Sequence, residues 1–369
     1  MKFVDEYRDP AAILALASRI RDEATQRWTL MEVCGGQTHA ILASGLDAMI
    51  ESAVELLHGP GCPVCVTPLE TLDRAQALAA LPDVVLCSFG DMLRVPNSNG
   101  NLFDARARGA DVRVVYSPLD AVRLAAANPE RRVVFLAVGF ETTVPAVAAA
   151  VRHARARGLS NFWLLTSHVR VPPALAAILS APETRIDAFL AAGHVCSIMG
   201  TQEYEPLVAR HRVPIVATGF EPRDILEGVL LAVRQLERGQ VRVEIQYRRA
   251  VRPEGNPAAR ALVEEVFEIV DRPWRGIGVV PGGGLALRAD WSAFDAERVF
   301  AELGKISALE PPECRAGEVL RGVLRPPACP EFGRGCTTER PLGAPMVSSE
   351  GACAAYYRYR PVDCLEASP

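Results

Sequence analysis

Ten cysteines carry most of the chemistry that this 369-residue sequence offers. They fall into an N-terminal group, one isolated residue and a C-terminal group: Cys34, Cys62, Cys65 and Cys87; Cys196; and Cys314, Cys329, Cys336, Cys353 and Cys364. Thiols inside a cell are mostly reduced, so grouped cysteines indicate metal ligands or redox centres rather than structural disulfides. We therefore expect two chemical regions, an N-terminal reactive set and a C-terminal ligand set.

The C-terminal set has the spacing C-x14-C-x6-C-x16-C, from Cys314 through Cys329 and Cys336 to Cys353. Four thiolates suit either a structural zinc ion or a [4Fe–4S] cluster. Zinc sites usually use CxxC turns, whereas all these gaps are wide, so the spacing favours an iron–sulfur cluster. Zinc and scattered core cysteines are the alternatives. Cys364, close to the chain end, is interpreted as an extra thiol.

A CxxC pair lies in residues 58–65, HGPGCPVC, after a Gly/Pro turn. Thr67 and Glu70 follow in a pattern that predicts a helix start, with the Thr67 hydroxyl as its cap. We expect the helix dipole to lower the pKa of the Cys62 and Cys65 thiols, which could form a reversible disulfide. The pair is interpreted as a redox centre. Half of a zinc site is the alternative, but no second CxxC completes it.

Two further motifs are expected at strand ends. Cys34 opens CGGQTH after an apolar run, where it is either functional or a buried thiol before a Gly turn. Residues 139–143, GFETT, would direct Glu141 and Thr142 into the same cleft, although Thr142 taken singly is better explained as a helix cap. Cys196 follows an apolar strand and is expected to be a packed thiol.

Together, CGGQTH, GPGCPVC, GFETT and the four spaced C-terminal cysteines resemble the HypD family of [NiFe]-hydrogenase maturation proteins across nearly the whole chain. The resemblance implies two related α/β lobes and a [4Fe–4S] domain. It also implies that the protein works with a small HypC-type chaperone and a HypE-type cyanide donor. Their product would be the Fe(CN)2(CO) unit of the hydrogenase large subunit.

The resemblance also assigns roles to residues. Cys34 would hold the iron of Fe(CN)2(CO), and Cys62 with Cys65 would be the redox pair. The cluster would be held by Cys314, Cys329, Cys336 and Cys353. The residues around the iron-binding cleft would be His39, Glu141 and Thr142. Gln37 departs from the family pattern, because many relatives have a histidine there. The protein is thus expected to be mainly an assembly scaffold with redox-active cysteines.

Two other functions remain open from the residues. In the first, the chain is an iron–sulfur-dependent disulfide reductase that acts through Cys62 and Cys65, and Cys34 is only structural. In the second, the C-terminal cysteines form a zinc clip on a ligand-binding α/β protein.

The elements that must position these residues alternate between short β-branched runs and longer Ala/Leu/Arg/Glu helices from residue 29 to about 250. This alternation is typical of a parallel α/β fold. Asp9 and Ser117 each precede a proline and predict helix starts. The predicted strands are nearly all apolar: 83–89, 112–116, 133–140, 162–166 and 214–220.

We expect three domains: a first α/β lobe at 1–160 with the N-terminal helix and reactive cysteines, a second at 161–300, and a loop-rich cluster domain at 301–369. The boundary near 160 rests on a faint repeat in which RVP precedes GFE twice, at residues 94–141 and 170–221. Seven prolines between residues 311 and 345 exclude long helices in the last domain.

Composition and charge exclude several classes of binding partner. A net charge of −4 and the lack of basic clusters argue against nucleic acid or anionic lipid as a ligand. No apolar stretch is long enough to span a membrane, and the acidic N-terminus does not resemble a secretory signal, so we expect a soluble cytoplasmic protein. No GxxxxGK[ST] motif supports a nucleotide site, and residues 281–284, PGGG, are predicted to form a flexible turn.

Overall fold

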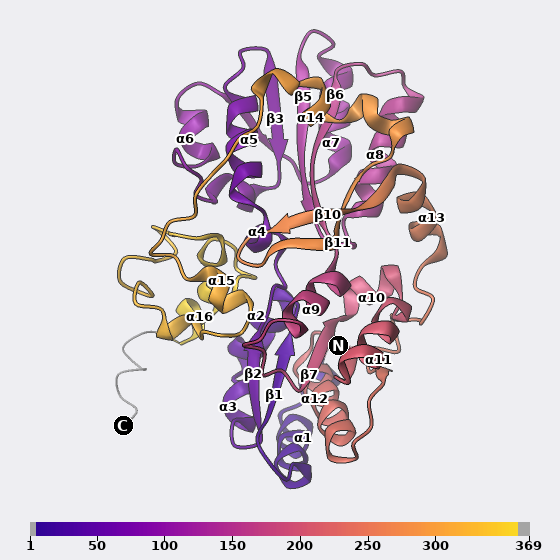
Figure 1. Cartoon of the computed structure of the whole chain (residues 1–369), viewed down its shortest axis with the longest axis vertical. Helices are drawn as coiled ribbons and strands as arrows, with labels where there is room; N and C mark the ends of the chain where they lie inside the picture. Colours follow the sequence, from indigo (N-terminus) through magenta and orange to yellow (C-terminus); the bar gives the residue numbers. More distant parts are fainter. Residues whose placement is uncertain (1–4, 361–369) are drawn as a thin grey trace.

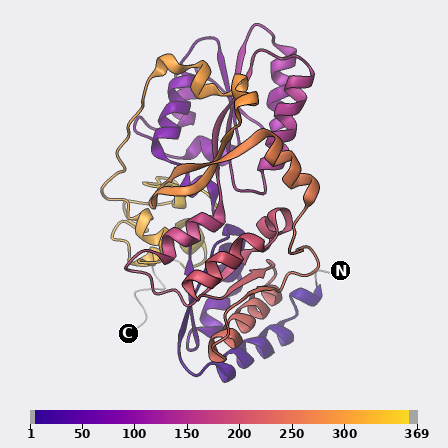
Figure 2. The same ribbon diagram turned by 45° about the vertical axis from the view of Figure 1, so that its right-hand side comes forward.

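The computed structural model describes residues 5–360 and contains two β-sheets, one above the other along the long axis of the molecule (Figure 1). The C-terminal segment lies beside the junction of the two sheets in both views (Figures 1 and 2). The α/β fold with two mainly parallel sheets confirms the prediction.

The first sheet is wholly parallel, in the order β2-β1-β7-β8-β9. Its strands are Trp28–Glu32 (β1), Val54–His58 (β2), Ala188–Ala192 (β7), Ile215–Thr218 (β8) and Val243–Ile245 (β9). The second sheet has the order β10-β11-β6-β5-β3-β4, in which β10 and β11 form an antiparallel hairpin on a parallel core. Its strands are Val84–Ser88 (β3), Asp111–Val114 (β4), Arg132–Gly139 (β5), Phe162–Val169 (β6), Phe267–Trp274 (β10) and Gly278–Leu287 (β11).

The two sheets are not built from consecutive parts of the chain. β1 and β2 pair with β7 and β8 from beyond residue 180, while residue 160 lies between β5 and β6, which are paired neighbours in the second sheet. The predicted limits 1–160 and 161–300 therefore do not coincide with the sheets. Chain order could not reveal this, because apolar runs do not specify their pairing partners.

The parallel parts of the sheets share one strand order, since each adds its second strand on one side of the first and its later strands on the other. This doubly wound order relates the two lobes. The RVP–GFE repeat does not mark the relation. One GFE follows the third strand of the second sheet, β5, and the other follows the fourth strand of the first sheet, β8.

Helices cover both faces of both sheets. One face of the first sheet packs against α1, α2, α3 and α12, and the other against α9, α10 and α11. The faces of the second sheet pack against α7, α8 and α13 and against α5, α6 and α14. The helices are Pro10–Glu23 (α1), Gly35–Ser44 (α2), Leu46–Ile50 (α3), Pro63–Val66 (α4), Leu69–Ala79 (α5), Leu102–Ala107 (α6), Pro118–Ala127 (α7), Val144–Ala156 (α8), Val171–Leu179 (α9), Gly193–Met199 (α10), Glu205–His211 (α11), Pro222–Glu237 (α12), Pro257–Val266 (α13) and Ala296–Val299 (α14).

Local signals predicted two of three helix starts. Asp9 accepts a hydrogen bond from Ala11 at the start of α1, and Ser117 forms a capping box with Asp120 at the start of α7. The prediction for Thr67 was wrong, because its hydroxyl donates to the Pro63 carbonyl of α4, and α5 begins at Leu69. The CxxC motif thus has a short helix of its own.

The predicted turn at residues 281–284 is also wrong, because these residues lie within β11. Gly282 has a φ of 60°, which a side chain would disfavour, and the Gly283 carbonyl accepts from the Trp274 indole N–H at 2.8 Å. The glycines therefore permit an irregular strand packed close to its neighbour, rather than a free turn.

The C-terminal segment, residues 301–360, is rich in loops as expected. Its helices are short: Ala316–Leu320 (α15), Ala352–Tyr359 (α16) and the 3₁₀ turns Ala301–Leu303, Pro326–Ala328 and Ala344–Met346. Further 3₁₀ turns elsewhere are Asp5–Tyr7, Gly90–Arg94, Gln202–Tyr204 and Ala289–Phe294. Cys364 lies outside the described residues. Within residues 5–360, no helix has the length and apolar character needed to cross a bilayer.

Candidate functional site

The carboxyl edge of the first sheet brings a thiol and an imidazole together. Cys34 follows β1 and His194 follows β7, and these strands are neighbours. The helices after them, α2 and α10, pack on opposite faces, so this edge is the topological switch point where such sheets bind ligands. The Cys34 Sγ lies 3.7 Å from the His194 Nδ1. The pair therefore occupies the position of this fold best suited to a ligand.

The ionisation of this pair suits a metal ion. Burial raises the pKa of the Cys34 thiol, although the backbone N–H groups of Gln37 and Gly36 that donate to its sulfur act in the opposite direction. Burial lowers the pKa of His194 to about 4, so the ring is neutral at pH 7. A metal ion takes the place of the thiol proton and binds neutral imidazole. The buried thiol would thus be deprotonated by binding rather than beforehand.

Sequence reasoning missed His194. Only Cys196 is named after β7 in the sequence analysis, although the His194 imidazole stands nearer to the strand end. The available signal was a histidine directly after an apolar strand. Its partner could not be inferred, because β1 and β7 are separated by more than 150 residues of sequence.

A buried carboxylate holds the Cys34 backbone in place. Glu32 is fully buried at the end of β1, and its Oε2 accepts the Cys34 backbone N–H at 2.7 Å. Its Oε1 accepts from the Thr38 hydroxyl and lies 2.7 Å from the Nδ1 of His58, at the end of β2. The His58 ring meets Tyr356 of α16 edge to face. One network therefore links Cys34, both strand ends and the C-terminal segment.

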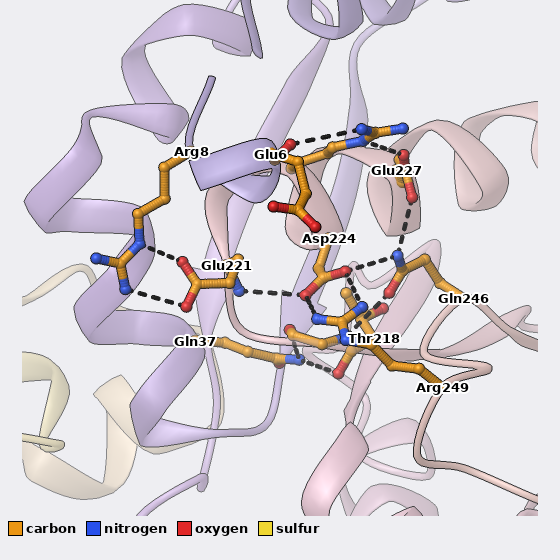
Figure 3. Close-up of polar contacts among 11 residues, drawn as sticks. Glu6, Arg8, Gln37, Thr218, Glu221, Asp224, Glu227, Gln246 and Arg249 are labelled. Carbon is orange, nitrogen blue, oxygen red and sulfur yellow. Dashed lines mark hydrogen bonds and ion pairs between the residues drawn. The ribbon is translucent and has the colours of Figure 1, made fainter. Parts of the chain in front are cut away.

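Gln37 faces the loop after β8, as Figure 3 shows. Its Nε2 donates to the carbonyl oxygens of Thr218 and Gly219 at 2.9 and 3.1 Å. The next residue, Phe220, packs on the His194 ring with centroids 5.2 Å apart. Gln37 thus positions the loop that packs on His194 and donates to carbonyl groups, which supports a positioning role rather than a metal ligand.

The same loop is held from its other side. Asp224 is fully buried, forms an ion pair with Arg249 and accepts from Gln246 at 3.0 Å (Figure 3). The Gln246 Oε1 also accepts the Gly219 backbone N–H at 3.1 Å. The loop carrying Phe220 is therefore held from both sides by hydrogen bonds to buried and half-buried side chains.

The CxxC turn is packed directly on Cys34. Cys62 caps α4, and its Sγ accepts the Cys65 backbone N–H at 3.3 Å. The Gly61 carbonyl accepts the Gly35 backbone N–H at 3.0 Å, and any side chain at Gly61 would overlap the Cys34 backbone. The structure therefore brings all three predicted N-terminal thiols to one strand edge.

The expected depression of thiol pKa values is not found at Cys65. The pKa of Cys65 is raised well above its ordinary value, and burial is the largest cause. The interaction with Cys62 and the charge of Cys353 raise it further. Burial outweighs the dipole of a helix as short as α4. Reduced Cys65 is therefore held as a thiol.

Three weaker candidates have their own surroundings. His39 lies on α2 with its Nε2 3.0 Å from the Tyr359 hydroxyl of α16. Glu141 is buried after β5, where its Oε1 accepts the Val171 backbone N–H at 2.8 Å. Burial raises the pKa of Glu141 to about 7. Thr142 is half-buried, and Thr143 rather than Thr142 occupies the cap position of α8.

Glu141 is close enough to Cys196 and Tyr204 for its charge to raise the pKa of both groups. Cys196 is fully buried in the apolar core between the lobes, as expected for a packed thiol. Glu141 is thus part of an interlobe cluster that sequence reasoning did not anticipate.

The four C-terminal cysteines line a single small cavity. After burial, the charges of Cys314, Cys336 and Cys329 are the largest causes that raise the pKa of Cys353, so the four sulfurs lie close together. Backbone N–H groups point at the sulfurs, such as that of Leu342 at 3.3 Å from the Cys336 Sγ. Such donors stabilise a thiolate that binds a metal.

Four thiols around one cavity could bind either a single metal ion or a polynuclear cluster. Four sulfurs on one zinc ion would lie about 3.8 Å apart. Within residues 5–360, no group of three or more histidines, cysteines or carboxylates is arranged to hold one metal ion. A polynuclear cluster would take one of these thiols at each corner.

The cavity and the CxxC turn share a wall. The Cys65 Sγ lies 3.9 Å from the Ala344 carbonyl oxygen. The preceding residue, Gly343, lines the cavity, and a side chain there would overlap the Cys314 sulfur. One turn of chain therefore separates the dithiol from the four-cysteine cavity.

Comparison with known proteins agrees with these features. The HypD family model, described as hydrogenase formation hypA family, matches residues 11–360. The hydrogenase maturation factor HypD of Escherichia coli K12 is 45% identical over 368 residues, or 98% of each chain. The factors from Azotobacter vinelandii and Rhizobium leguminosarum are 47% and 46% identical, over 97% of this chain and 97% and 96% of theirs. The chain therefore belongs to the HypD family of hydrogenase maturation factors.

Proposed function

We propose that this protein is the scaffold on which the Fe(CN)2(CO) unit of [NiFe]-hydrogenase is assembled and carried. The observation that supports this most is the buried Cys34–His194 pair at the switch point of the first sheet. Low-spin iron with cyanide and carbonyl ligands is a soft centre that thiolate suits, and burial shields it from oxygen and water. The iron is cargo here, not a resident cofactor.

Cys34 would bind the iron as a thiolate, with His194 as a neutral second ligand or a hydrogen-bond partner. Glu32 holds the Cys34 backbone, and Gln37 holds the loop that presses Phe220 against His194. A small HypC-type chaperone would deliver or receive the iron, and a HypE-type protein would donate cyanide. The hydrogenase large subunit would be served indirectly.

Cys62 and Cys65 would supply redox equivalents beside the iron. Reduction of their disulfide takes two electrons and two protons and yields two thiols. A [4Fe–4S] cluster on Cys314, Cys329, Cys336 and Cys353 would supply the electrons one at a time from an external one-electron donor. The shared wall at Gly343 and Ala344 supports transfer between the two sites.

Infrared spectroscopy of the protein co-purified anaerobically with its small chaperone tests the proposal. We expect cyanide and carbonyl stretches from one iron, and their loss in Cys34→Ala with the visible absorption of the cluster intact. Cys364→Ser, which changes a thiol outside both sets, should keep the bands. Bands that survive Cys34→Ala would contradict the proposed iron site.

The buried dithiol beside four thiols also supports a second candidate, an iron–sulfur-dependent disulfide reductase. In that case Cys34→Ala retains disulfide turnover and Cys62→Ser abolishes it. The scaffold predicts that both substitutions prevent iron assembly.

A further inference from the structure

The tip of the β10–β11 hairpin reaches from the second sheet to both cysteine sites. Figure 1 shows the hairpin running toward α4 and the C-terminal segment. The Arg275 backbone N–H donates to the Val66 carbonyl of the CxxC helix at 2.8 Å. On the other side, the Gly276 carbonyl accepts from Arg321 at 2.5 Å, and Gly276 packs on the backbone of Gly317 in α15. The tip therefore fits between the dithiol and the cysteine cavity.

Arg275 places a cation in this position, and its side chain is only 3% exposed. One guanidinium nitrogen donates to Glu310 at 2.7 Å, and Glu310 is 44% exposed. The other terminal nitrogen is buried and has no hydrogen-bond partner in the described part of the chain. A buried cation with a free donor is costly unless negative charge lies nearby.

The cysteines would supply negative charge once they bind a metal as thiolates. The Arg275 guanidinium acts to lower the pKa of the Cys314 thiol, against the stronger effect of burial, while Glu310 acts to raise it. Glu313 and Glu331 also line the cavity and add to its acidity. Arg275 is thus a buried cation whose charge acts on one thiol, Cys314, of a site that would hold four thiolates.

We propose that Arg275 balances the charge of the four-cysteine site and raises the reduction potential of the cluster that the site holds. The inference rests on the proposed function, since it assumes a redox-active cluster. Each electron added makes the site more negative, and a buried cation stabilises the reduced form more than the oxidised form. Arg275 touches no substrate, and it acts through the cluster.

Arg315 provides a matched comparison. It follows Cys314 and lines the same cavity, but its side chain is 43% exposed and it is ion-paired with Glu318. Water and salt screen such a charge. The loss of one positive charge at Arg315 should therefore shift the reduction potential much less than the loss of one positive charge at Arg275.

Redox titration of the anaerobically purified full-length protein tests the inference, with visible and electron paramagnetic resonance spectra as readouts. In Arg275→Gln we expect the equilibrium to shift about tenfold toward the oxidised cluster, or ~59 mV for one electron. Glu310→Gln should shift the potential in the opposite direction, because it leaves Arg275 unneutralised. Arg275→Lys should retain most of the wild-type potential, and Arg315→Gln should change it little. Iron and sulfide content is measured for every variant.

A wild-type potential in Arg275→Gln, or shifts of the same sign in Arg275→Gln and Glu310→Gln, would overturn the inference. If Arg275→Gln loses its iron, the reduction potentials of Arg275→Lys and Glu310→Gln still test the inference. Wild-type protein without a reducible cluster refutes the proposed redox function as well. A normal wild-type cluster that does not respond to Arg275→Gln refutes only the role of Arg275.

Discussion

The N-terminal thiols and the C-terminal thiols are positioned in opposite ways. Cys34 stands at a strand end, and Cys62 and Cys65 form a helical turn packed on it, all at most 3% exposed. The C-terminal cysteines are half-buried and lie in loops and short turns, apart from Cys353 in α16. The first site is therefore fixed by two sheets and their helices, whereas the second is surrounded by little regular structure.

The difference indicates what each site needs in order to form. The three N-terminal thiols belong to the large apolar core that joins the lobes. The C-terminal segment has a small core of its own: Leu42 of α2 with Phe332, Met346, Ala354, Ala355 and Tyr356. Small segments with few apolar contacts usually depend on a metal for their order. We infer that the first site exists before it binds the proposed iron, and that the second depends on the proposed cluster.

The largest expected effect is at the second site. Cys336→Ser removes one of the four thiolates, so we expect loss of the cluster iron and fast proteolysis within residues 305–360. The two sheets should keep their circular dichroism and cooperative unfolding. Iron analysis with limited proteolysis measures this, and Cys364→Ser is the control. If the segment resists protease without iron, packing alone orders it, and the two sites would not differ in what they need in order to form.

The second prediction concerns ionisation at the buried junction of the lobes. Burial raises the pKa of Glu141 from its ordinary value of 4.5 to about 7. Between these values the folded protein holds a proton that the unfolded chain releases, so the free energy of unfolding falls as pH rises through this window. The loss is on the order of 3 kcal/mol and is complete above pH 7.

Glu141→Gln keeps an acceptor for the Val171 N–H and cannot ionise, so its stability should change less between pH 4.5 and 7. Urea unfolding of both proteins at pH 5 and pH 8 measures the difference. Glu339→Gln, at an exposed carboxyl of the C-terminal segment, is the control. Equal pH dependence in wild type and Glu141→Gln would mean that the carboxyl is solvated in solution.

Much of this fold follows from local patterns. Apolar runs predicted β3, β4, β5, β6 and β8, because strands buried on both faces are apolar throughout. β2 was not predicted, since Glu55 and His58 make it look like a loop, and neither were β9, β10 and β11. The pairing of β1 with β7 also escaped prediction, because it joins segments far apart in the chain.

The sites show the same limit. Strand-end chemistry predicted the position of Cys34 only, and the family resemblance alone linked it to Cys62 and Cys65, because the strand before the CxxC turn, β2, was not predicted. His194 was missed, since its position beside Cys34 depends on the order of strands rather than on any motif. The raised pKa of Cys65 was missed for a related reason, because burial is a property of the packed molecule.

The prediction with the smallest expected effect is the most direct test of whether the two sites form independently. Gly61 joins the CxxC turn to Cys34, and a methyl group there would overlap backbone atoms that cannot move without shifting β1. We expect Gly61→Ala to lower the free energy of unfolding by about 2 kcal/mol and to expose Cys34 to alkylation. Gly90→Ala, where a methyl group has room, should do neither. If the first site is built independently of the second, Gly61→Ala keeps its cluster iron, whereas loss of that iron would show that the shared wall at Ala344 couples the two sites.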